Sequence, residues 1–180
     1  LSLGGTERTM ELFCQYLCKE KYEVFSVSKY FKPDVAAWFR VKFGLLYFHK
    51  LARAKNKLWK SMDARIPSFK RILGVDHVFI ADNDSEVKRI LMELKPDILH
   101  VHYSGRAEPP TSDEELMSKI PVTVTTNQFE IENTAPAHRH VKRILFVSKW
   151  MLQNQAHWAK SDPRAEVFYN PTELPLSTET

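Results

Sequence analysis

The sequence has 180 residues, a length typical of one domain, and 43% of them are hydrophobic. This is enough for a buried core and excludes a disordered tail. The net charge is +4, but the basic residues concentrate between residues 29 and 73, where twelve Lys and Arg face two Asp. We therefore expect a folded domain with a strongly basic insert and, since no apolar run is long enough, no membrane-spanning segment.

The chain begins with a glycine turn, Gly4-Gly5, that leads into a helical pattern. Adjacent glycines allow a tight turn and close approach of a ligand, and free N–H groups at a helix start attract anions. The pattern predicts a phosphate-binding turn at Gly4, Gly5, Thr6 and Glu7, although a plain strand-to-helix turn explains the glycines about equally well. The strand that should feed this turn would precede Leu1, so we expect the sequence to be a fragment.

The helix after this turn has an apolar stripe at helical spacing. Its members are Met10, Phe13, Cys14 and Leu17. Cys14 and Cys18 are the only cysteines, and their spacing of four along one helix disfavours a disulfide. We expect both to be reduced packing residues without a metal.

The basic insert has the pattern of a cationic amphipathic helix. Its apolar residues recur at helical spacing, and basic residues occupy the adjoining face. The apolar set is Val41, Leu45, Phe48, Ala52, Trp59 and Met62, and the basic set includes Lys42, Arg53, Lys57 and Lys60. We expect Lys42, Arg53, Lys57, Trp59 and Lys60 to contact an anionic membrane surface. The alternatives are a crossover helix packed on the sheet and RNA binding, for which no recognition fold is evident.

Short apolar runs predict the strands, and helical patterns lie between them. The expected strands are residues 23–28, 77–80, 97–102, 122–126, 143–148 and 165–169. Ser112 and Glu115 form a capping-box pattern at the start of a short helix. This alternation predicts an α/β fold, a Rossmann-like, mostly parallel sheet with helices on both faces and right-handed crossovers.

Ligands of such sheets bind at the carboxyl ends of the strands. By this rule we expect the glycine turn, His102, Asn127 and Ser148 to lie along one rim of the sheet. The polar stretch 127–140 is long for a connection, and such loops are usually functional or mobile. Glu130 and Glu132 in it either bind acceptor hydroxyls or are simply solvated.

Four histidines are also candidates for function: His100, His102, His138 and His140. A metal cluster is possible, but solvated or hydrogen-bonded histidines are commoner, so we expect no metal. For His102, a role in an acceptor site and a structural role are about equally well supported.

The order of the motifs resembles the N-terminal domain of a retaining, GT-B-fold glycosyltransferase of the family 4 type. The resemblance covers most of the chain except residues 29–76. It rests on Gly-Gly-x-Glu-Arg at residues 4–8, Lys-Pro-Asp-Ile-Leu-His-Val-His at 95–102, Ile-Pro-Val-Thr-Val-Thr at 120–125, Ile-Leu-Phe-Val-Ser-Lys at 144–149 and Val-Phe-Tyr-Asn-Pro at 167–171.

The resemblance implies one half of a two-domain enzyme. Residues 1–170 would be the acceptor-side Rossmann-like domain, 171–180 the start of a hinge, and the donor-binding domain would lie outside this sequence. Gly4, Gly5, Thr6 and Glu7 would lie near the diphosphate of a nucleotide sugar, without a metal or other cofactor, and His102, Asn127 and Ser148 near the sugar and acceptor. The acceptor would be lipid-linked or a polysaccharide of the cell envelope, and the enzyme cytoplasmic and peripheral to the inner face of the membrane. No nucleic acid would be a partner, and the fragment alone would be inactive.

One position departs from the family pattern. Where the family commonly has Thr-x-His, this chain has Thr125-Thr126-Asn127. An amide hydrogen-bonds to hydroxyls but does not exchange a proton at neutral pH. The alternative is therefore a non-catalytic module that binds saccharide or docks on a membrane. A nicotinamide dehydrogenase is a distant third, because Gly-x-Gly-x-x-Gly is absent.

Overall fold

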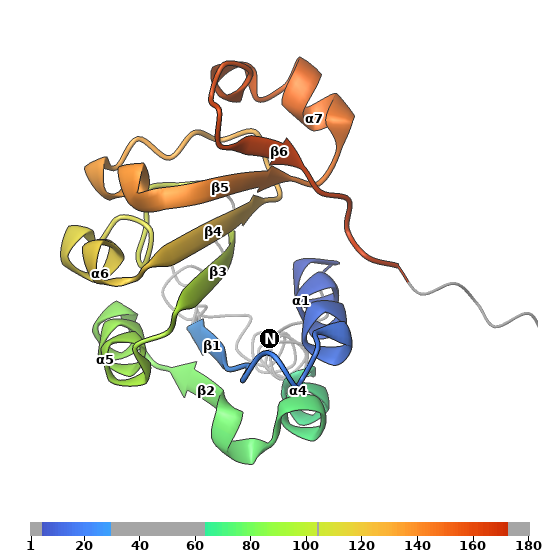
Figure 1. Ribbon diagram of the computed structural model, residues 1–180, viewed down its shortest axis with the longest axis vertical. Coiled ribbons are helices and arrows are strands. Elements are labelled where there is room, and N and C mark those ends of the chain that lie inside the picture. The colour runs from blue at the N-terminus through green and yellow to red at the C-terminus, as the bar shows by residue number, and fades with distance from the viewer. Residues whose placement is uncertain (1–4, 30–63, 104, 173–180) are drawn as a thin grey trace, which may run out of the picture. The chain divides into compact units, whose positions relative to one another are not determined.

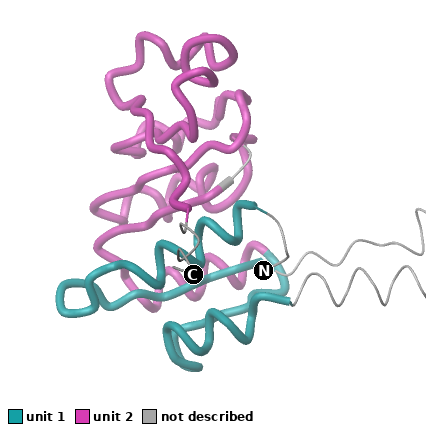
Figure 2. The backbone as a smooth tube through the Cα atoms, turned by 90° about the vertical axis from the view of Figure 1, so that its right-hand side faces the viewer, with its two compact units in different colours: residues 1–83 teal, residues 84–180 magenta. Residues whose placement is uncertain are grey.

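The computed structural model describes residues 5–29, 64–103 and 105–172. It has an α/β fold of parallel strands flanked by helices, as predicted (Figure 1). The chain divides into two compact units, residues 1–83 and 84–180, which are described separately (Figure 2).

The first unit contains a parallel pair of strands, β1 (Ser26–Lys29) and β2 (Val78–Ala81). Its described helices are α1 (Gly5–Tyr16) and α4 (Ile66–Leu73), followed by the 3-10 turn η2 (Val75–His77). Helices α1 and α4 pack on each other, and the core gathers around Cys14, Phe69 and Val78. Burial raises the pKa of the Cys14 thiol to about 11, which fits the expected packing role.

The buried side of α1 differs from the predicted stripe. It consists of Thr9, Glu11, Leu12 and Cys14, whereas Leu17 lies beyond the helix end and is exposed. Glu11 is only 5% exposed, and it accepts bonds from Arg65 (2.6 Å), Arg8 (2.7 Å) and the Ser68 hydroxyl. Burial by itself raises the pKa of this carboxyl, but the Ser68 and Arg8 bonds and the Arg65 charge outweigh it, so the pKa lies below its usual range. Arg65, the residue before α4, is thus tied to α1.

The second unit contains four parallel strands in the order β3-β4-β5-β6. They are β3 (Ile98–Tyr103), β4 (Val122–Asn127), β5 (Val141–Phe146) and β6 (Ala165–Val167). The helices are α5 (Asp84–Leu94), α6 (Glu114–Lys119) and α7 (Lys149–Asn154), with 3-10 turns η3 (Pro136–His140) and η4 (His157–Ala159). The core is built around Ile144 and Phe146 of β5 with Met117, Met151 and Ala156.

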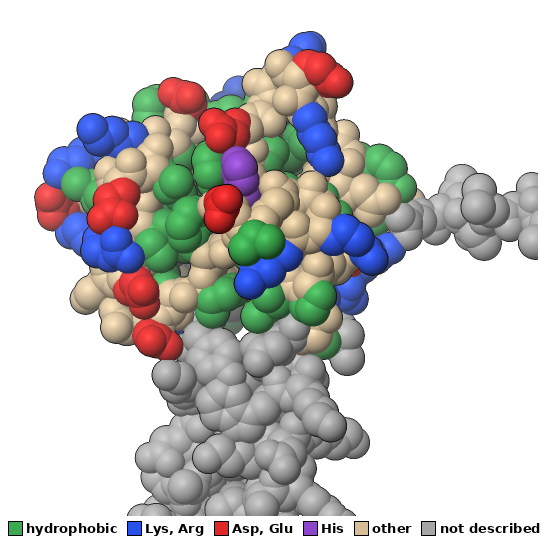
Figure 3. Space-filling model, turned by 90° about the horizontal axis from the view of Figure 1, so that it is seen from below, with side chains coloured by type: hydrophobic (Ala, Val, Ile, Leu, Met, Phe, Trp, Pro, Cys, Tyr) green, Lys and Arg blue, Asp and Glu red, His purple; other side chains and the backbone are tan. Residues whose placement is uncertain are grey.

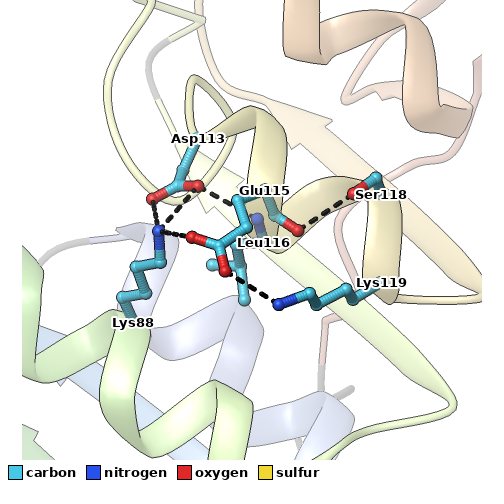
Figure 4. Close-up of polar contacts among 6 residues, drawn as sticks. All are labelled: Lys88, Asp113, Glu115, Leu116, Ser118 and Lys119. Carbon is cyan, nitrogen blue, oxygen red and sulfur yellow. Dashed lines mark hydrogen bonds and ion pairs between the residues drawn. The ribbon is translucent and has the colours of Figure 1, made fainter.

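The cap of α6 corrects the predicted capping box. The cap is Asp113, not Ser112, and its carboxylate accepts from the Leu116 N–H at 3.0 Å. Lys88 of α5 donates to Asp113 (3.2 Å) and to Glu115 (2.7 Å), and Glu115 also accepts from Lys119 (Figure 4). The bonds from Lys119 and then Lys88 lower the pKa of Glu115 to about 2. Asp113 is favoured because a carboxylate caps the helix and pairs with Lys88 at once.

Candidate functional site

The four parallel strands of the second unit end at one edge of their sheet, called here the carboxyl edge. Tyr103, Asn127, Phe146 and Val167 are aligned across the four strands at this edge. In Figure 1 the arrowheads of β4, β5 and β6 point to the same side of the sheet. His102 and Asn127 are therefore brought to neighbouring strand ends, as the sequence predicts.

The histidines of β3 occupy one face of the sheet. The His100 and His102 rings lie 4.3 Å apart between centroids, and His100 Nε2 lies 2.7 Å from the Thr126 hydroxyl. Burial lowers the pKa of His100 to about 4, and burial together with the charge of His100 lowers that of His102 to about 3. Both imidazoles are therefore neutral at physiological pH and offer hydrogen bonds rather than charge.

Asn127 belongs to the opposite face. Side chains alternate along a strand, and Thr126 shares the face of His100, so Asn127 lies on the face of Phe146, its partner in register. Asn127 is fully buried, and among the described residues neither its amide nitrogen nor its amide oxygen has a hydrogen-bond partner. The structure thus brings His102 and Asn127 to one edge but not to one face.

The long loop after β4 is held by packing against the loop after β3. Gly105 has a φ of +94°, and a Cβ placed on it would lie 2.1 Å from the Ile131 carbonyl oxygen and 3.4 Å from Asn127 Nδ2. The buried Asn133 amide donates to Thr111 Oγ1 at 2.9 Å, and Trp158 Nε1 donates to the Glu130 carbonyl at 2.8 Å. We call these contacts the loop lock. The sequence predicts that this loop is either functional or mobile, and these contacts argue against mobility.

Ser148 has a local structural partner. It caps α7, and its hydroxyl accepts from the Met151 N–H at 3.1 Å. The sequence correctly brings Ser148 near the carboxyl edge, just after β5, but the cap already engages its hydroxyl oxygen.

The glycine turn is described from Gly5 onward, and Gly4 lies outside the described residues. Gly5 is the first residue of α1, followed by Thr6 and Glu7 in the first turn. Among the described residues, a Cβ on Gly5 would meet nothing within 4 Å. Free N–H groups in the first turn of a helix favour anions.

Several other predicted residues fall outside the described ranges. They are the membrane-contact residues Lys42, Arg53, Lys57, Trp59 and Lys60. Within the described ranges, none of the helices is long and apolar enough to cross a bilayer. The same part of the chain holds no group of three or more His, Cys, Asp or Glu side chains placed to bind a metal. On the face seen in Figure 3, side chains of both charges are interspersed rather than segregated.

Sequence reasoning missed one anchored arginine, Arg164. It pairs with Asp162 at 2.7 Å and donates to the carbonyls of His138 (2.9 Å) and Val141 (3.3 Å). Burial, and then the Arg164 charge, lowers the pKa of His138 to about 4. The Asp-Pro-Arg sequence at 162–164 reads as an ordinary turn, so the pattern carries no signal for this contact.

Comparison with known proteins brings no match, whether with a family model, a curated protein or a solved structure. The chemistry of the site therefore rests on the geometry described above.

The buried His138 and the partly buried His100 and His102 predict a pH dependence of stability. His100, His102 and His138 are neutral in the fold down to about pH 4, whereas in the unfolded chain each binds a proton near pH 6.5. Stability is thus fully present above pH 6.5 and is lost as the pH falls toward 4, by about 1.4 kcal/mol per pH unit for each histidine. Urea unfolding across this range measures the slope. His138→Gln should reduce it, and His157→Gln, an exposed control, should not.

The loop lock predicts different costs for alanine at two glycines. Gly74 and Gly105 both have positive φ, but a Cβ on Gly74 would only touch the His77 ring at 3.5 Å. Gly74→Ala should cost about 1–2 kcal/mol of unfolding free energy. Gly105→Ala should cost about 1–3 kcal/mol more, because it overpacks against a backbone carbonyl. Equal losses of unfolding free energy for the two variants, measured by urea unfolding, would mean that the loops after β3 and β4 separate freely.

Proposed function

We propose that this chain is the acceptor-side half of a retaining GT-B-fold glycosyltransferase that moves a sugar from a nucleotide-diphosphate donor to a lipid-linked or polysaccharide acceptor. The observation that carries the proposal is Gly5 at the head of α1, where no other described residue lies within 4 Å of the position of a Cβ. Parallel α/β architecture is what such a half-domain requires, and the motifs at residues 95–102, 120–125 and 144–149 fall on or beside β3, β4 and β5.

In this proposal, the N–H groups of Gly5, Thr6 and Glu7 neutralise part of the charge on the leaving diphosphate. Preorganised donors at a helix start stabilise such charge without reorganisation. His102, as a neutral imidazole, offers hydrogen bonds to hydroxyls of the sugar and acceptor, whereas Asn127 supports the strand end from its buried position. The donor base and the catalytic groups belong to the second domain, so residues 1–180 by themselves do not turn over substrate.

The buried Asn127 supports a second candidate, a saccharide-binding or membrane-docking module without catalysis. An amide at this position exchanges no proton. The two candidates differ in one measurement. The intact gene product either releases nucleoside diphosphate from a nucleotide sugar with an acceptor present, as the enzyme requires, or binds saccharide without turnover.

Gly5→Ala tests the anion site. The new Cβ would meet no described residue within 4 Å, so the unfolding free energy should stay unchanged or rise by up to about 1 kcal/mol. Pyrophosphate should shift the amide NMR signals of Gly5, Thr6 and Glu7 in residues 1–180, and the variant should bind it about tenfold more weakly, a difference of about 1.4 kcal/mol.

The first amides of α5, Asp84 and Ser85, serve as the control helix start in the same spectra. Shifts of equal size there would mean that pyrophosphate binds helix starts in general. Amides of α1 that stay unmoved would contradict the proposed diphosphate site.

The proposed enzyme is cytoplasmic and peripheral to an anionic membrane, through the basic insert. Replacing Lys42, Arg53, Lys57 and Lys60 with Gln should lower recovery on anionic liposomes more than tenfold, since each basic residue near such a surface contributes about 1 kcal/mol. Flotation with and without anionic lipid measures this.

A matched variant removes the same charge elsewhere, by replacing the exposed Lys21, Lys142, Lys149 and Lys160 with Gln. It should float like the wild type. Equal recovery on neutral vesicles, or equal losses in the two variants, would reject the membrane contact.

A further inference from the structure

Exposed aromatic side chains follow three neighbouring strand ends at the carboxyl edge. Phe129 comes two residues after β4 and is 56% exposed, and Trp150, the second residue of α7 after β5, is 61% exposed. Tyr169 comes two residues after β6 and is 64% exposed, beside the partly exposed Phe168. Because β4, β5 and β6 are adjacent, these rings follow strand ends that extend over about two strand spacings, or about 10 Å. We call them the aromatic edge.

The backbone beneath each ring is fixed. Trp158 holds the Glu130 carbonyl next to Phe129, and Ser148 caps the helix turn that carries Trp150. The Phe168 N–H donates to the Phe146 carbonyl at 2.9 Å. A ligand of these rings therefore need not order the chain, which lowers the entropy cost of binding.

The composition of the aromatic edge argues against a protein partner. Of the large hydrophobic side chains that are exposed in the described part of this unit, the aliphatic ones, Ile98 and Val122, begin β3 and β4 at the opposite end of the sheet. The cores of protein interfaces usually combine aromatic with other apolar side chains. Flat rings set among polar groups instead suit a ligand with alternating C–H and hydroxyl faces.

The charges and amides nearby narrow the ligand further. Glu130 and Glu132 are exposed in the loop that carries Phe129, and the exposed Lys149 precedes Trp150, so the aromatic edge is not a basic surface of the kind that attracts phosphates and anionic lipid. Asn127 and Gln128 immediately precede this ring. Among the described residues, both amide atoms of Asn127 and the amide nitrogen of Gln128 are buried without a hydrogen-bond partner. These amide atoms lie beneath the surface, so the exposed Glu130 and Glu132 carboxylates are the groups that can accept bonds from ligand hydroxyls.

We infer that the aromatic edge binds a neutral oligosaccharide, with sugar rings packed on Trp150, Phe129 and Tyr169 and hydroxyls bonded to the exposed carboxylates of the loop after β4. This rests on the proposed function and identifies its acceptor as a saccharide chain, because the edge is long enough for more than one ring. Trp150, the largest of the three, is the main stacking residue.

Fluorine NMR of residues 1–180 labelled with fluorotryptophan tests this inference. The chain has four tryptophans, so Trp150 gives one signal that is assigned through Trp150→Phe. The probes are maltohexaose, cellohexaose, laminarihexaose and mannohexaose at millimolar concentration. At least one should shift the Trp150 signal in a saturable way, and Phe129→Ala and Tyr169→Ala should each weaken its binding several-fold to tenfold.

The matched control is Tyr16→Ala, which removes an aromatic ring of similar exposure, 66%, from α1 in the other unit. It should leave binding unchanged. All three replaced side chains are exposed, and circular dichroism checks that each variant folds. If no hexasaccharide shifts the Trp150 signal, or if Tyr16→Ala weakens binding equally, the inference is wrong.

A third outcome also overturns it, namely a Trp150 signal that responds to phosphatidylcholine vesicles and not to sugars, which would indicate a lipid surface. The experiments distinguish a failure of saccharide binding at the aromatic edge from a failure of the proposed function. Pyrophosphate binding at Gly5 is measured on the other unit and does not depend on the aromatic rings.

Discussion

The close approach of Gly105 to the Ile131 carbonyl is the constraint on which the carboxyl edge depends. No side chain larger than hydrogen fits between the two loops, because a Cβ would lie 2.1 Å from that oxygen. The contact lets the loop after β3 lie against the loop after β4, and the Asn133 bond to Thr111 fastens the same pair of loops. Phe129 and the buried amide of Asn127 are thereby held on a rigid support rather than on a free connection.

The sheet places two kinds of polar group on opposite faces, although the sequence predicts them along one rim. The neutral His100 and His102 lie with Thr126 on one face, and Asn127 lies with Phe146 on the other. Alternation along β3 and β4 enforces this separation, because neighbouring residues of a strand face opposite ways. A ligand that bonds to both His102 and Asn127 must therefore reach over the end of the strands rather than lie on one face.

The elements were largely predictable from the sequence, because apolar runs with β-branched residues locate the six strands of the described part of the chain to within three residues at their ends. Contacts between segments that are distant in the sequence were not predictable. Glu11 interrupts an apolar stripe, and only the fold brings Arg65 and Ser68 to it across more than fifty residues. Asp113 displaces Ser112 as a cap because Lys88 stands opposite it, and Arg164 bonds to carbonyls that carry no sequence signal.

The Glu11 network has a consequence for any study of the basic insert. Arg65 belongs to that insert by sequence, yet its guanidinium neutralises a buried carboxylate of the first helix. Removing it would leave Arg8 as the one cation described beside that carboxylate and would loosen the first unit, since breaking a buried pair is destabilising. A charge-depleted insert intended to report on surface attraction must therefore retain this one arginine, or it will report on unfolding instead.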